Sequence, residues 1–466
     1  MTHRLKSVHL TNYYHKHSGG ISTSFNNLLA AAERHERFVR LIVPGEKEEI
    51  ENVNPFAKIY YVPANYSPLF DKRYRILMPW HYMLKDTAIR KILLEEKPDI
   101  IEVTDKYTLS MIGGMIRTHN FKRIGRPMLV HFSCERMDDS IGSFLTTGRA
   151  GKWLARRVIA NYTIPSFDHH IANSTYTAEE FYESLSPEKN PHRSKVFLNR
   201  CWQFLNAARV PISEMISVCP RGVDSVHFNP SRTSDAVRHE MIEAAGIPED
   251  AVILLYAGRL SPEKNIGLLV DLMKILSTDA NHDYRLLIAG AGPQSDWLGK
   301  HGEKFAAGKL KQLGHLDKEP LADYYANADV FVHPNPKEPF GIAPLEAMAS
   351  GVATVAPNAG GILSYATNEN AWLVEPTGEQ FAAAIREVVE NATLRENKIA
   401  KALATARTNT REASTDRLFA TYDRIHEDFQ TRNELFTDIE KAKGFDFVNE
   451  LLIGGGFRRR ELEDKI

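Results

Sequence analysis

The stretch from Glu338 to Gly351 reads EPFGIAPLEAMASG and follows an apolar run, Val330–His333, that has the composition of a buried β-strand. Pro339 and Gly341 are typical of a loop, and Pro344 suits the first turn of a helix, where its missing N–H costs nothing. The backbone N–H groups around Gly341 then point out of the helix start toward an anion. Strand, loop and helix in this order form the unit from which parallel α/β sheets are built.

The same alternation of apolar runs and amphipathic stretches extends along the chain. In the first half, strands are predicted at Lys6–Leu10, Phe38–Val43, Ile59–Val62, Ile100–Val103, Pro127–Phe132 and His169–Ala172. The pattern restarts with predicted strands at Val252–Tyr256, Arg285–Ala289, Val330–His333 and Ala353–Ala356. Helical patterns lie between most of them, for example Ser22–Arg34, for which Ser22 or Thr23 is the expected N-cap. The sequence therefore predicts an α/β protein with two Rossmann-like, doubly wound domains and ligands at the carboxyl ends of the strands, in the cleft that the domains face.

The predicted domains are an N-terminal one over residues 1–228 and a C-terminal one over 229–412, separated by the turn-rich Asn229-Pro230-Ser231. A last segment, 413–466, contains a long helix pattern at Ser414–Phe429 and a polar tail with three glycines and three arginines. Residues 185–212 interrupt the alternation with basic and aromatic side chains, and we interpret them as an insert.

Charge is distributed unevenly behind a net value of -1. Residues 1–210 carry 30 Lys and Arg against 21 Asp and Glu, a balance of +9, whereas the remainder has a balance of -10. The first half is therefore expected to meet an anionic surface or ligand.

Composition excludes several classes of protein. The chain has no run of 18 apolar residues, and the short apolar stretch after Met1–Ser7 argues against a signal peptide. Its three cysteines form no CxxC pair, which argues against a disulfide framework and for a reducing cytoplasm. No Cys and His cluster has zinc spacing, so we expect no metal site.

Two carboxylates flank the anion site that the opening stretch predicts. Glu338 precedes it in the loop and Glu346 follows within the first turns of the helix. A phosphate held by backbone donors, with an acceptor on each side, suits a sugar nucleotide whose two sugars carry hydroxyl donors. A surface glutamate in an ordinary loop is the alternative for either carboxylate alone, but the whole ordered stretch favours a binding site.

A second candidate site follows the predicted strand Val252–Tyr256. The segment Gly258-Arg259-Leu260-Ser261-Pro262-Glu263-Lys264 places two cations beside a helix start. Arg259 offers a fork for phosphate oxygens and Lys264 a point charge, so together they could neutralise a diphosphate leaving group. The alternative is a solvated pair of cations capped by Glu263.

Two weaker candidates lie in the first half. Gly19-Gly20 precedes a predicted helix and permits close approach of the backbone to phosphate, although a simple tight turn would look the same. His131 lies at the end of a predicted strand, where this fold displays ligands, and could bind a hydroxyl or phosphate. A structural histidine is the alternative, and Cys134 is interpreted as a small filler.

These residues resemble those of retaining glycosyltransferases with the GT-B fold, specifically family 4, the glycosyl transferases group 1. The matching features are Gly19-Gly20, His131, Asp168 with Asn173-Ser174, Pro220-Arg221-Gly222-Val223-Asp224, Gly258-Arg259 with Glu263-Lys264, Gly314-His315-Leu316, and Glu338 with Glu346. The likeness covers residues 1 to about 430 and is most specific in the C-terminal motifs. It also implies that the C-terminal helix crosses back to the N-terminal domain. The 185–212 insert, the tail and Arg221, where the family usually has a smaller polar residue, depart from it.

The resemblance implies a role for each matching residue. Glu338 would bind the hydroxyls of the donor sugar, and Glu346 the ribose. Arg259 and Lys264 would hold the diphosphate in place of a metal ion. Backbone groups would assist at the diphosphate and the base, and His131 would touch the donor sugar near its reaction centre. The residues expected to contribute through the backbone or nearby contacts are Gly19, Gly20, Gly258, Leu316, Phe340, Gly341 and Ile342.

The expected reaction is transfer of a hexose from a GDP- or UDP-sugar of the GDP-mannose or UDP-glucose type, with no cofactor. The acceptor is expected to be a glycan, a small sugar or a glycolipid on the N-terminal domain, with an anionic membrane surface as a further partner and no nucleic acid. Two basic-aromatic segments, 70–80 and 149–158, suit the inner face of the plasma membrane. A solvated basic face is the alternative there.

Two other functions use the same fold. A GT-B sugar-nucleotide epimerase would need no acceptor, and a non-catalytic sensor would bind a nucleotide sugar without transferring it. The Arg259–Lys264 pair and the spacing of Glu338 and Glu346 favour transfer.

Overall fold

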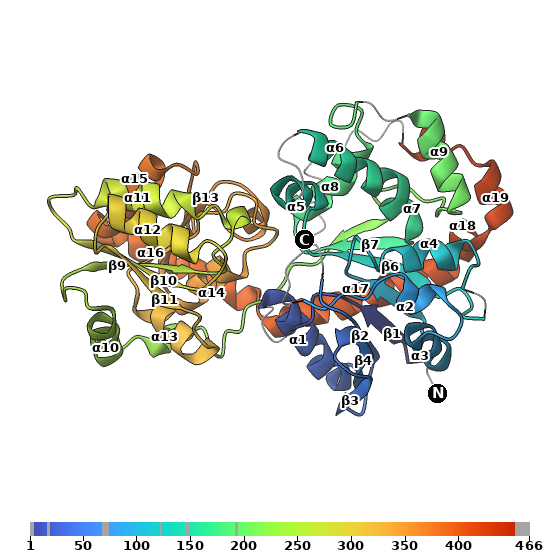
Figure 1. The fold of residues 1–466 in the computed structure, drawn as a ribbon, viewed down its shortest axis with the longest axis horizontal. Coiled ribbons are helices and arrows are strands. Elements are labelled where there is room, and N and C mark those ends of the chain that lie inside the picture. Colours follow the sequence, from blue (N-terminus) through green and yellow to red (C-terminus); the bar gives the residue numbers. More distant parts are fainter. Residues whose placement is uncertain are drawn as a thin grey trace. The chain divides into compact units, whose positions relative to one another are not determined.

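The computed structural model describes residues 4–15, 19–67, 74–121, 123–144, 149–191 and 194–452. The chain divides into two compact units, one of Met1–Pro220 with Ser414–Ile466 and one of Arg221–Ala413. We call them the N-terminal unit and the C-terminal unit, and each contains its own sheet (Figure 1). The divisions fall after residues 220 and 413, compared with 228 and 412 in the division drawn from the sequence.

The N-terminal unit is built on an eight-stranded sheet of order β3-β4-β2-β1-β5-β6-β7-β8. Its strands are β1 (Lys6–Leu10), β2 (Phe38–Gly45), β3 (Glu49–Asn54), β4 (Ala57–Pro63), β5 (Ile100–Val103), β6 (Met128–Ser133), β7 (His169–Ala172) and β8 (Ile216–Val218). All neighbours run parallel except the antiparallel pair β3 and β4. The prediction misses β3, an exposed edge strand without an apolar run, and the short β8.

Helices cover both faces of this sheet. They are α1 (Gly20–Arg34), α2 (Trp80–Met83), α3 (Ala88–Glu96), α4 (Met111–Arg117), α5 (Met137–Phe144), α6 (Arg149–Val158), the π-helical turn η1 (Ile159–Thr163), α7 (Ile164–Ser166), α8 (Thr175–Leu185) and α9 (Lys195–Phe204). Leu129 and Val130, neighbours on β6, belong to different hydrophobic clusters. This burial on both sides is what a doubly wound sheet requires.

The C-terminal unit repeats the plan with a six-stranded sheet of order β11-β10-β9-β12-β13-β14. Its strands are β9 (Val252–Ala257), β10 (Tyr284–Ala289), β11 (Leu310–Gly314), β12 (Val330–Val332), β13 (Ala353–Pro357) and β14 (Trp372–Val374), and every neighbouring pair is parallel. The prediction misses β11, which contains two polar residues, and the three-residue β14. The prediction of two Rossmann-like, doubly wound domains is confirmed.

The helical elements of this unit lie before, between and after its strands. They are η2 (Pro230–Arg232), α10 (Asp235–Ala245), η3 (Pro262–Lys264), α11 (Gly267–Leu276), α12 (Ser295–Phe305), α13 (Lys318–Asn327), α14 (Ile342–Ser350), η4 (Gly361–Ser364), α15 (Gly378–Glu390) and α16 (Ala392–Thr408). Leu254 and Leu255 of β9 again belong to different hydrophobic clusters, one on each face.

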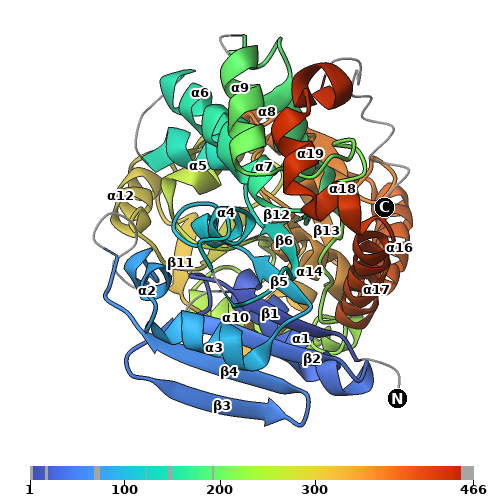
Figure 2. The same ribbon diagram turned by 90° about the vertical axis from the view of Figure 1, so that its right-hand side faces the viewer.

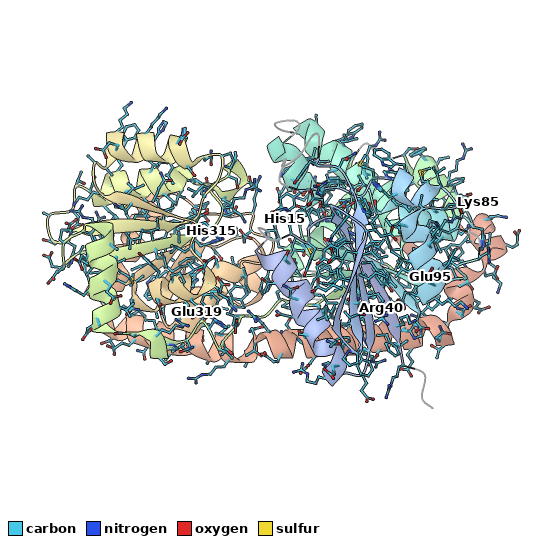
Figure 3. The ribbon with its side chains drawn as sticks, turned by 60° about the horizontal axis from the view of Figure 1, so that its bottom comes forward. His15, Arg40, Lys85, Glu95, His315 and Glu319 are labelled. Carbon is cyan, nitrogen blue, oxygen red and sulfur yellow. The ribbon has the colours of Figure 1, made fainter. Side chains whose placement is uncertain are left out.

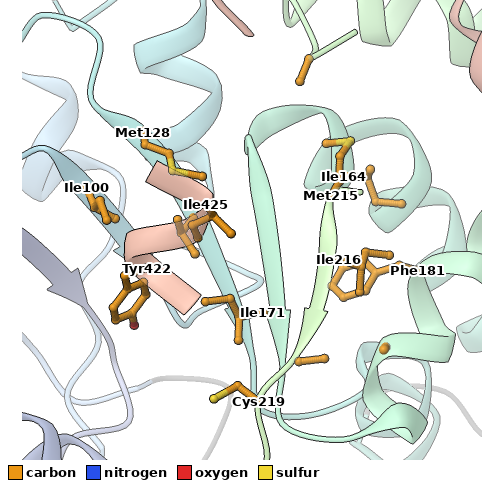
Figure 4. Packing of buried hydrophobic residues seen from close by; sticks show 14 of the residues in the cluster. Ile100, Met128, Ile164, Ile171, Phe181, Met215, Ile216, Cys219, Tyr422 and Ile425 are labelled. Carbon is orange, nitrogen blue, oxygen red and sulfur yellow. The ribbon is translucent and has the colours of Figure 1, made fainter. Parts of the chain in front are cut away.

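The last helices return to the N-terminal unit, as the resemblance implies. They are α17 (Arg411–Thr431), α18 (Asn433–Thr437), α19 (Ile439–Gly444) and the π-helical turn η5 (Val448–Leu452). Tyr422 and Ile425 of α17 lie in the core beside Ile100, Met128 and Ile171 (Figure 4). The polar tail from residue 453 onward lies outside the described residues.

The described residues of 185–212, the segment interpreted as an insert, contribute to this core. They contain α9, whose Trp202 is fully buried and donates its indole N–H to the carbonyl of Ala160 at 2.9 Å. Leu198 and Val210 belong to the same hydrophobic cluster. Of the basic and aromatic residues that suggested an insert, Lys195, Phe197, Arg200 and Phe204 lie on the outer side of α9, whereas Trp202 lies on its apolar inner side.

The start of α1 also differs from the prediction. The helix begins at Gly20 with Gly19 as its N-cap, rather than at Ser22 or Thr23. Ser22 Oγ accepts a hydrogen bond from the backbone N–H of His15 and donates to its carbonyl, each at 2.9 Å. The hydroxyl holds the preceding loop against the first turn, so it is not free to cap the helix.

Candidate active site

The opening stretch forms the loop between β12 and α14. Gly341 has a φ of 86°, which glycine adopts at little cost, and it is the N-cap of α14. A Cβ at this position would lie 2.9 Å from the hydroxyl of Tyr365, and that hydroxyl donates to the Gly341 carbonyl. The helix begins at Ile342, two residues before the predicted Pro344, and its first N–H groups remain available for an anion.

Glu338 lies in this loop and contacts Lys264, which is 74 residues away in the chain. The Lys264 ammonium is 2.8 Å from Glu338 Oε2, and the Asn335 amide donates to the same oxygen at 3.0 Å. Burial by itself would raise the pKa of Glu338, but the charges of Lys264 and His333 and these hydrogen bonds lower it to about 2. Glu338 is therefore an ionised acceptor, held in place by a cation.

His333 and Asn335 are two residues of this site that sequence reasoning missed. His333 is buried, with Nε2 3.9 Å from Glu338 Oε2, and burial lowers its pKa to about 4. Asn265 Nδ2 donates to the carbonyl of Pro334 at 2.9 Å and connects the segment after η3 to the same loop. The signal was present in the sequence as polar residues immediately after the strand Val330–Val332.

Arg259 follows β9 in the same unit. Tyr256 Oη donates to the Arg259 carbonyl at 3.0 Å, and a Cβ at Gly258 would lie 2.9 Å from that hydroxyl. The Arg259 side chain is partly buried, at the end of the strand that leads into η3 and Lys264. Both predicted cations thus follow one strand, at its carboxyl end.

Glu346 lies on α14, where the hydroxyl of Tyr325 donates to its Oε2 at 3.2 Å. Burial raises the pKa of Glu346 to about 7, against the hydrogen bond from Tyr325 and the charges of Lys318 and Arg411. Those two cations both contact Asp224. The pKa values of Glu338 and Glu346, predicted as a pair, are therefore shifted in opposite directions.

A second glycine pair, Gly360-Gly361, supports the loop and was also missed. A Cβ at Gly361 would lie 1.9 Å from the Pro339 carbonyl oxygen, and the Gly361 N–H donates to the Glu338 carbonyl at 2.7 Å. Gly360 has a φ of 82°. The two glycines follow β13 in the way that Gly19-Gly20 follows β1, so their position after a strand was the available signal.

Two predicted ligand residues of the C-terminal unit have different surroundings. Phe340 is buried, with its ring 5.2 Å from that of Tyr365, so its side chain is part of the core and only its backbone faces the loop. Leu316 follows β11 and is partly exposed. His315, which precedes it, is exposed and is labelled in Figure 3.

His131 is not exposed at the end of its strand as the sequence analysis expects. It lies within β6, two residues before the strand ends, and has no exposed area. Its Nδ1 is 3.3 Å from His170 Nδ1, and its ring contacts those of Phe167 and Phe181. Burial lowers its pKa well below the usual value, so this imidazole is neutral in the core.

The acid nearest the end of β6 is Glu135, which follows Ser133 by two residues. Ser140 Oγ donates to its Oε2 at 3.0 Å, and the hydroxyls of Tyr13 and Tyr107 lie 3.5 Å and 3.4 Å from Oε1. Burial raises the pKa of Glu135. The group gathers at the carboxyl ends of β1, β5 and β6, because Tyr13, Tyr107 and Glu135 each follow one of these strands.

Gly19 and Gly20 lie at the same edge of this sheet, after β1 and at the start of α1. A Cβ at Gly19 would meet nothing within 4 Å, so the backbone there is open to approach. Arg156, one of the cations in the predicted membrane segment 149–158, is turned inward, because it contacts Asp138 at 3.3 Å and Glu183 at 2.8 Å.

Comparison with known proteins agrees with this architecture. Residues 237–404 match the family model described as glycosyl transferases group 1. The chain is 29% identical over 392 residues, 83% of its length and 88% of the relative, to a GDP-mannose-dependent alpha-(1-6)-phosphatidylinositol dimannoside mannosyltransferase of Mycobacterium tuberculosis. It is 34% identical over 174 residues to a GDP-mannose-dependent alpha-mannosyltransferase of Corynebacterium glutamicum, covering 36% of this chain and 38% of that one.

A solved structure, sucrose-phosphate synthase from Thermosynechococcus elongatus, matches with a TM-score of 0.67 at 18% identity, over 91% of this chain and 99% of that one. The fold and the sequence matches together define a glycosyltransferase with the GT-B fold. Residues 237–404 resemble the glycosyl transferases group 1, and the chain transfers a glycosyl group from a nucleotide sugar to an acceptor.

Proposed function

We propose that this protein is a retaining mannosyltransferase of family 4 that transfers mannose from GDP-mannose to a glycolipid, without a metal ion. The observation that carries the proposal is the pairing of Lys264 with Glu338 beside the N-terminus of α14. The pairing provides, at one place, a cation, an ionised carboxylate that can accept hydrogen bonds from hydroxyl groups, and backbone N–H donors. GDP-mannose is favoured as donor because the two relatives reported above are named for it.

In the proposed complex the donor lies along the 333–341 loop. Glu338 accepts hydrogen bonds from the sugar hydroxyls, and Glu346 accepts them from the ribose. Arg259, Lys264 and the first N–H groups of α14 hold the diphosphate. Leu316 contacts the base through its backbone.

The chemical step follows from where negative charge develops. The bond between the anomeric carbon and the β-phosphate oxygen breaks, and its electron pair leaves with GDP. Arg259, Lys264 and the helix dipole stabilise that charge. The acceptor hydroxyl attacks the oxocarbenium-like sugar from the same face, and its proton passes to the departing phosphate, so configuration is retained.

We propose that the acceptor binds the N-terminal unit at the carboxyl edge of its sheet. The group around Glu135 supports this, since a partly buried carboxyl group with two tyrosine hydroxyls can hold a sugar hydroxyl. His131 is assigned a supporting role behind this edge, because its ring is buried.

A glycolipid acceptor places the enzyme at the cytoplasmic face of a membrane, which agrees with the positive balance of the first half. In the described residues, no helix combines the length and apolarity that crossing a bilayer requires. Of the two predicted membrane segments, residues 70–73 lie outside the described part of the chain, whereas 149–158 forms α6.

The test is a transfer assay with radiolabelled GDP-mannose and phosphatidylinositol dimannoside in detergent micelles, with UDP-glucose as the competing donor. We expect a lipid-extractable mannosylated product with an α-linkage, formed equally well in EDTA. Transfer from UDP-glucose but not from GDP-mannose would overturn the assignment of the donor. A β-linked product would overturn the retaining step. Loss of activity in EDTA would overturn the metal-independent mechanism. An epimerase would convert the donor without any acceptor.

A further inference from the structure

Helix α9 exposes its largest apolar side chains to solvent. Phe204, Val196 and Phe197 are 75%, 63% and 55% exposed, and Phe204 is the most exposed large apolar residue in the described part of the N-terminal unit. Phe197 and Phe204 are separated by about two helical turns, and Val196 and Arg200 are separated by about one turn. Their side chains therefore form one stripe along the outer side of the helix.

The orientation of this stripe is fixed by the opposite side of α9. Leu198 and Trp202 are buried, and the Trp202 indole is hydrogen-bonded to the carbonyl of Ala160. Ser194 caps the helix by accepting from the N–H of Phe197, and Gln203 donates to the carbonyl of Phe445 at 2.9 Å. The helix cannot rotate to bury its phenylalanines without exposing the tryptophan, so the apolar face is a stable feature of the surface.

The charges on α9 are all positive. The helix has no Asp or Glu, and its two cations, Lys195 and Arg200, are exposed. Neither makes an ion pair with any residue that the structure describes. Apolar side chains accompanied by unneutralised cations are the composition of helices that lie in the interface of an anionic bilayer.

A neighbouring helix carries the same combination. On α6, Trp153 and Leu154 are exposed, and the Arg157 guanidinium lies 4.5 Å from the centre of the Trp153 ring. Both α6 and α9 pack against η1, and both lie at the same end of the unit in two perpendicular views (Figures 1 and 2). We call the exposed residues Trp153, Leu154, Val196, Phe197 and Phe204 the apolar patch.

Two occupants compete for such a patch, a bilayer and a second copy of this chain. A two-fold contact centred on α9 would place Lys195 and Arg200 against the same cations of the partner, with no acid on the helix to offset them. An anionic lipid surface provides the opposite charge along with an apolar interior for the phenylalanine rings. The charge pattern therefore favours the bilayer.

We propose that the apolar patch is the surface by which this protein docks on a bilayer that contains anionic lipid, with α9 lying in the plane of the headgroups. Phe197 and Phe204 enter the acyl boundary, while Lys195 and Arg200 contact phosphate groups. This inference is connected with the proposed function only because a lipid acceptor makes docking useful. The exposed apolar side of α9 does not depend on the proposed function.

The experiment is flotation of the full-length protein with vesicles of equal parts phosphatidylglycerol and phosphatidylcholine. We expect the wild type to float with these vesicles, and much less with pure phosphatidylcholine or at high salt. The double variant Phe197→Glu/Phe204→Glu should lose at least about tenfold in partitioning for each ring removed. Trp153→Glu/Leu154→Glu should show a smaller loss.

The matched control is Ile50→Glu on β3, which is 56% exposed and lies in the same unit. It should float like the wild type. Unchanged flotation of the Phe197/Phe204 variant would overturn the proposal. So would loss of flotation in Trp80→Glu/Leu84→Glu alone, because that would assign docking to the α2 region. A change from dimer to monomer by light scattering, with flotation retained, would assign the patch to a second copy.

Each variant is also tested for stabilisation by GDP, which reports an intact C-terminal unit and does not depend on lipid. A variant that no longer floats has lost docking and not its fold if it is stabilised by GDP like the wild type and also keeps the wild-type circular dichroism and urea unfolding midpoint, which report the N-terminal unit. If the wild type floats but transfers nothing from GDP-mannose, the proposed function fails and the docking surface stands. If it transfers mannose to a micellar acceptor but does not float, the docking surface fails and the proposed function stands.

Discussion

The Lys264 ammonium lies 2.8 Å from Glu338 Oε2, so the cation assigned to the leaving group and the carboxylate assigned to the donor sugar are bound to one another. The pair keeps Glu338 ionised and aligned before a donor arrives. A diphosphate that enters the site offers Lys264 a second anion, and the sugar hydroxyls offer Glu338 new donors. In the proposed complex the donor would exchange contacts with a pair that is already positioned, which would reduce the reorganisation needed for catalysis.

Replacing either partner of this pair should abolish transfer. In Lys264→Ala the developing charge on the leaving diphosphate loses a cation, and in Glu338→Gln the sugar loses its ionised acceptor. We expect a decrease in kcat of about 10²–10³ for each, by analogy with removal of one transition-state donor. Initial rates with saturating donor measure it.

Lys300→Ala is the control for that prediction, since Lys300 is an exposed lysine on α12 of the same unit. It should retain wild-type kcat. Near-native rates in either Lys264→Ala or Glu338→Gln, with the fold intact by circular dichroism, would contradict the assignment of the site.

Donor binding should depend on pH through Glu346. Burial raises the pKa of this carboxyl group to about 7, so it is protonated below neutrality and ionised above it. Only the ionised form accepts hydrogen bonds with both oxygens from the ribose hydroxyls. The KM for the donor should therefore fall as the pH rises from about 6 to 8.

In Glu346→Gln this pH dependence should disappear, with the donor KM remaining high throughout. The pH dependence of the free energy of unfolding gives an independent check on the direction of this pKa shift. A pKa raised in the folded state means that stability falls as the pH rises from the unfolded value of about 4.3 toward 7. The Gln variant should lack that part of the decline in urea unfolding, and an unchanged pH profile would exclude Glu346.

The glycine at position 361 should be intolerant of a side chain. In Gly361→Ala the new Cβ would overlap the Pro339 carbonyl oxygen, 1.9 Å away, and displace the loop that carries Glu338. We expect at least about a tenfold loss in donor affinity, measured by the thermal shift that GDP produces. Gly267→Ala is the control, because its Cβ would meet only Trp297 at 3.8 Å, and it should bind GDP normally.

The return of α17 to the N-terminal unit should depend on a buried hydroxyl. Tyr422 Oη donates to Glu102 Oε2 at 2.5 Å, and Glu102 Oε1 lies 2.9 Å from His9 Nδ1. Tyr422→Phe leaves a buried carboxylate oxygen without its donor, which costs about 1–3 kcal/mol. Urea unfolding followed by tryptophan fluorescence measures the loss. Tyr66→Phe, at an exposed position, should change stability by less than about 0.5 kcal/mol.

Acceptor use should depend on Glu135 without any effect on the donor. Glu135→Gln alters the group that gathers Tyr13, Tyr107 and Ser140 at the edge of the N-terminal sheet. We expect a higher acceptor KM and about a tenfold lower kcat/KM for the acceptor, with the GDP thermal shift unchanged. Equal weakening of donor and acceptor binding would indicate a general loss of structure instead.

Segments with a strong local signal were predicted well from the sequence. Strands such as Lys6–Leu10 and Val330–Val332 are short apolar runs bounded by loops, and both are buried on two faces. The missed strands lack that signal. Strand β3 reads EIENVN and is exposed along nearly its whole length, because it pairs on one side only.

Side-chain direction was the main source of error. His131 was expected to face a ligand because it lies close to the end of a strand, yet its ring points into the core beside His170 and Phe181. A doubly wound sheet is buried on both faces, so its strands lack an alternation of apolar and polar residues that would show which way a side chain points. The same reason explains α9, whose aromatic residues divide between Trp202 inside and Phe197 and Phe204 outside.

The sequence by itself determined the two sheets, the loop before α14 and the candidate donor residues, because each depends on residues that are close together in the chain. Only the tertiary structure paired Lys264 with Glu338 and Tyr422 with Glu102, and only it turned the phenylalanines of α9 outward. Backbone hydrogen bonds and local periodicity specify helices and strands. The partner of a buried charge, and the face that a helix leaves in solvent, depend on packing between segments far apart in the sequence.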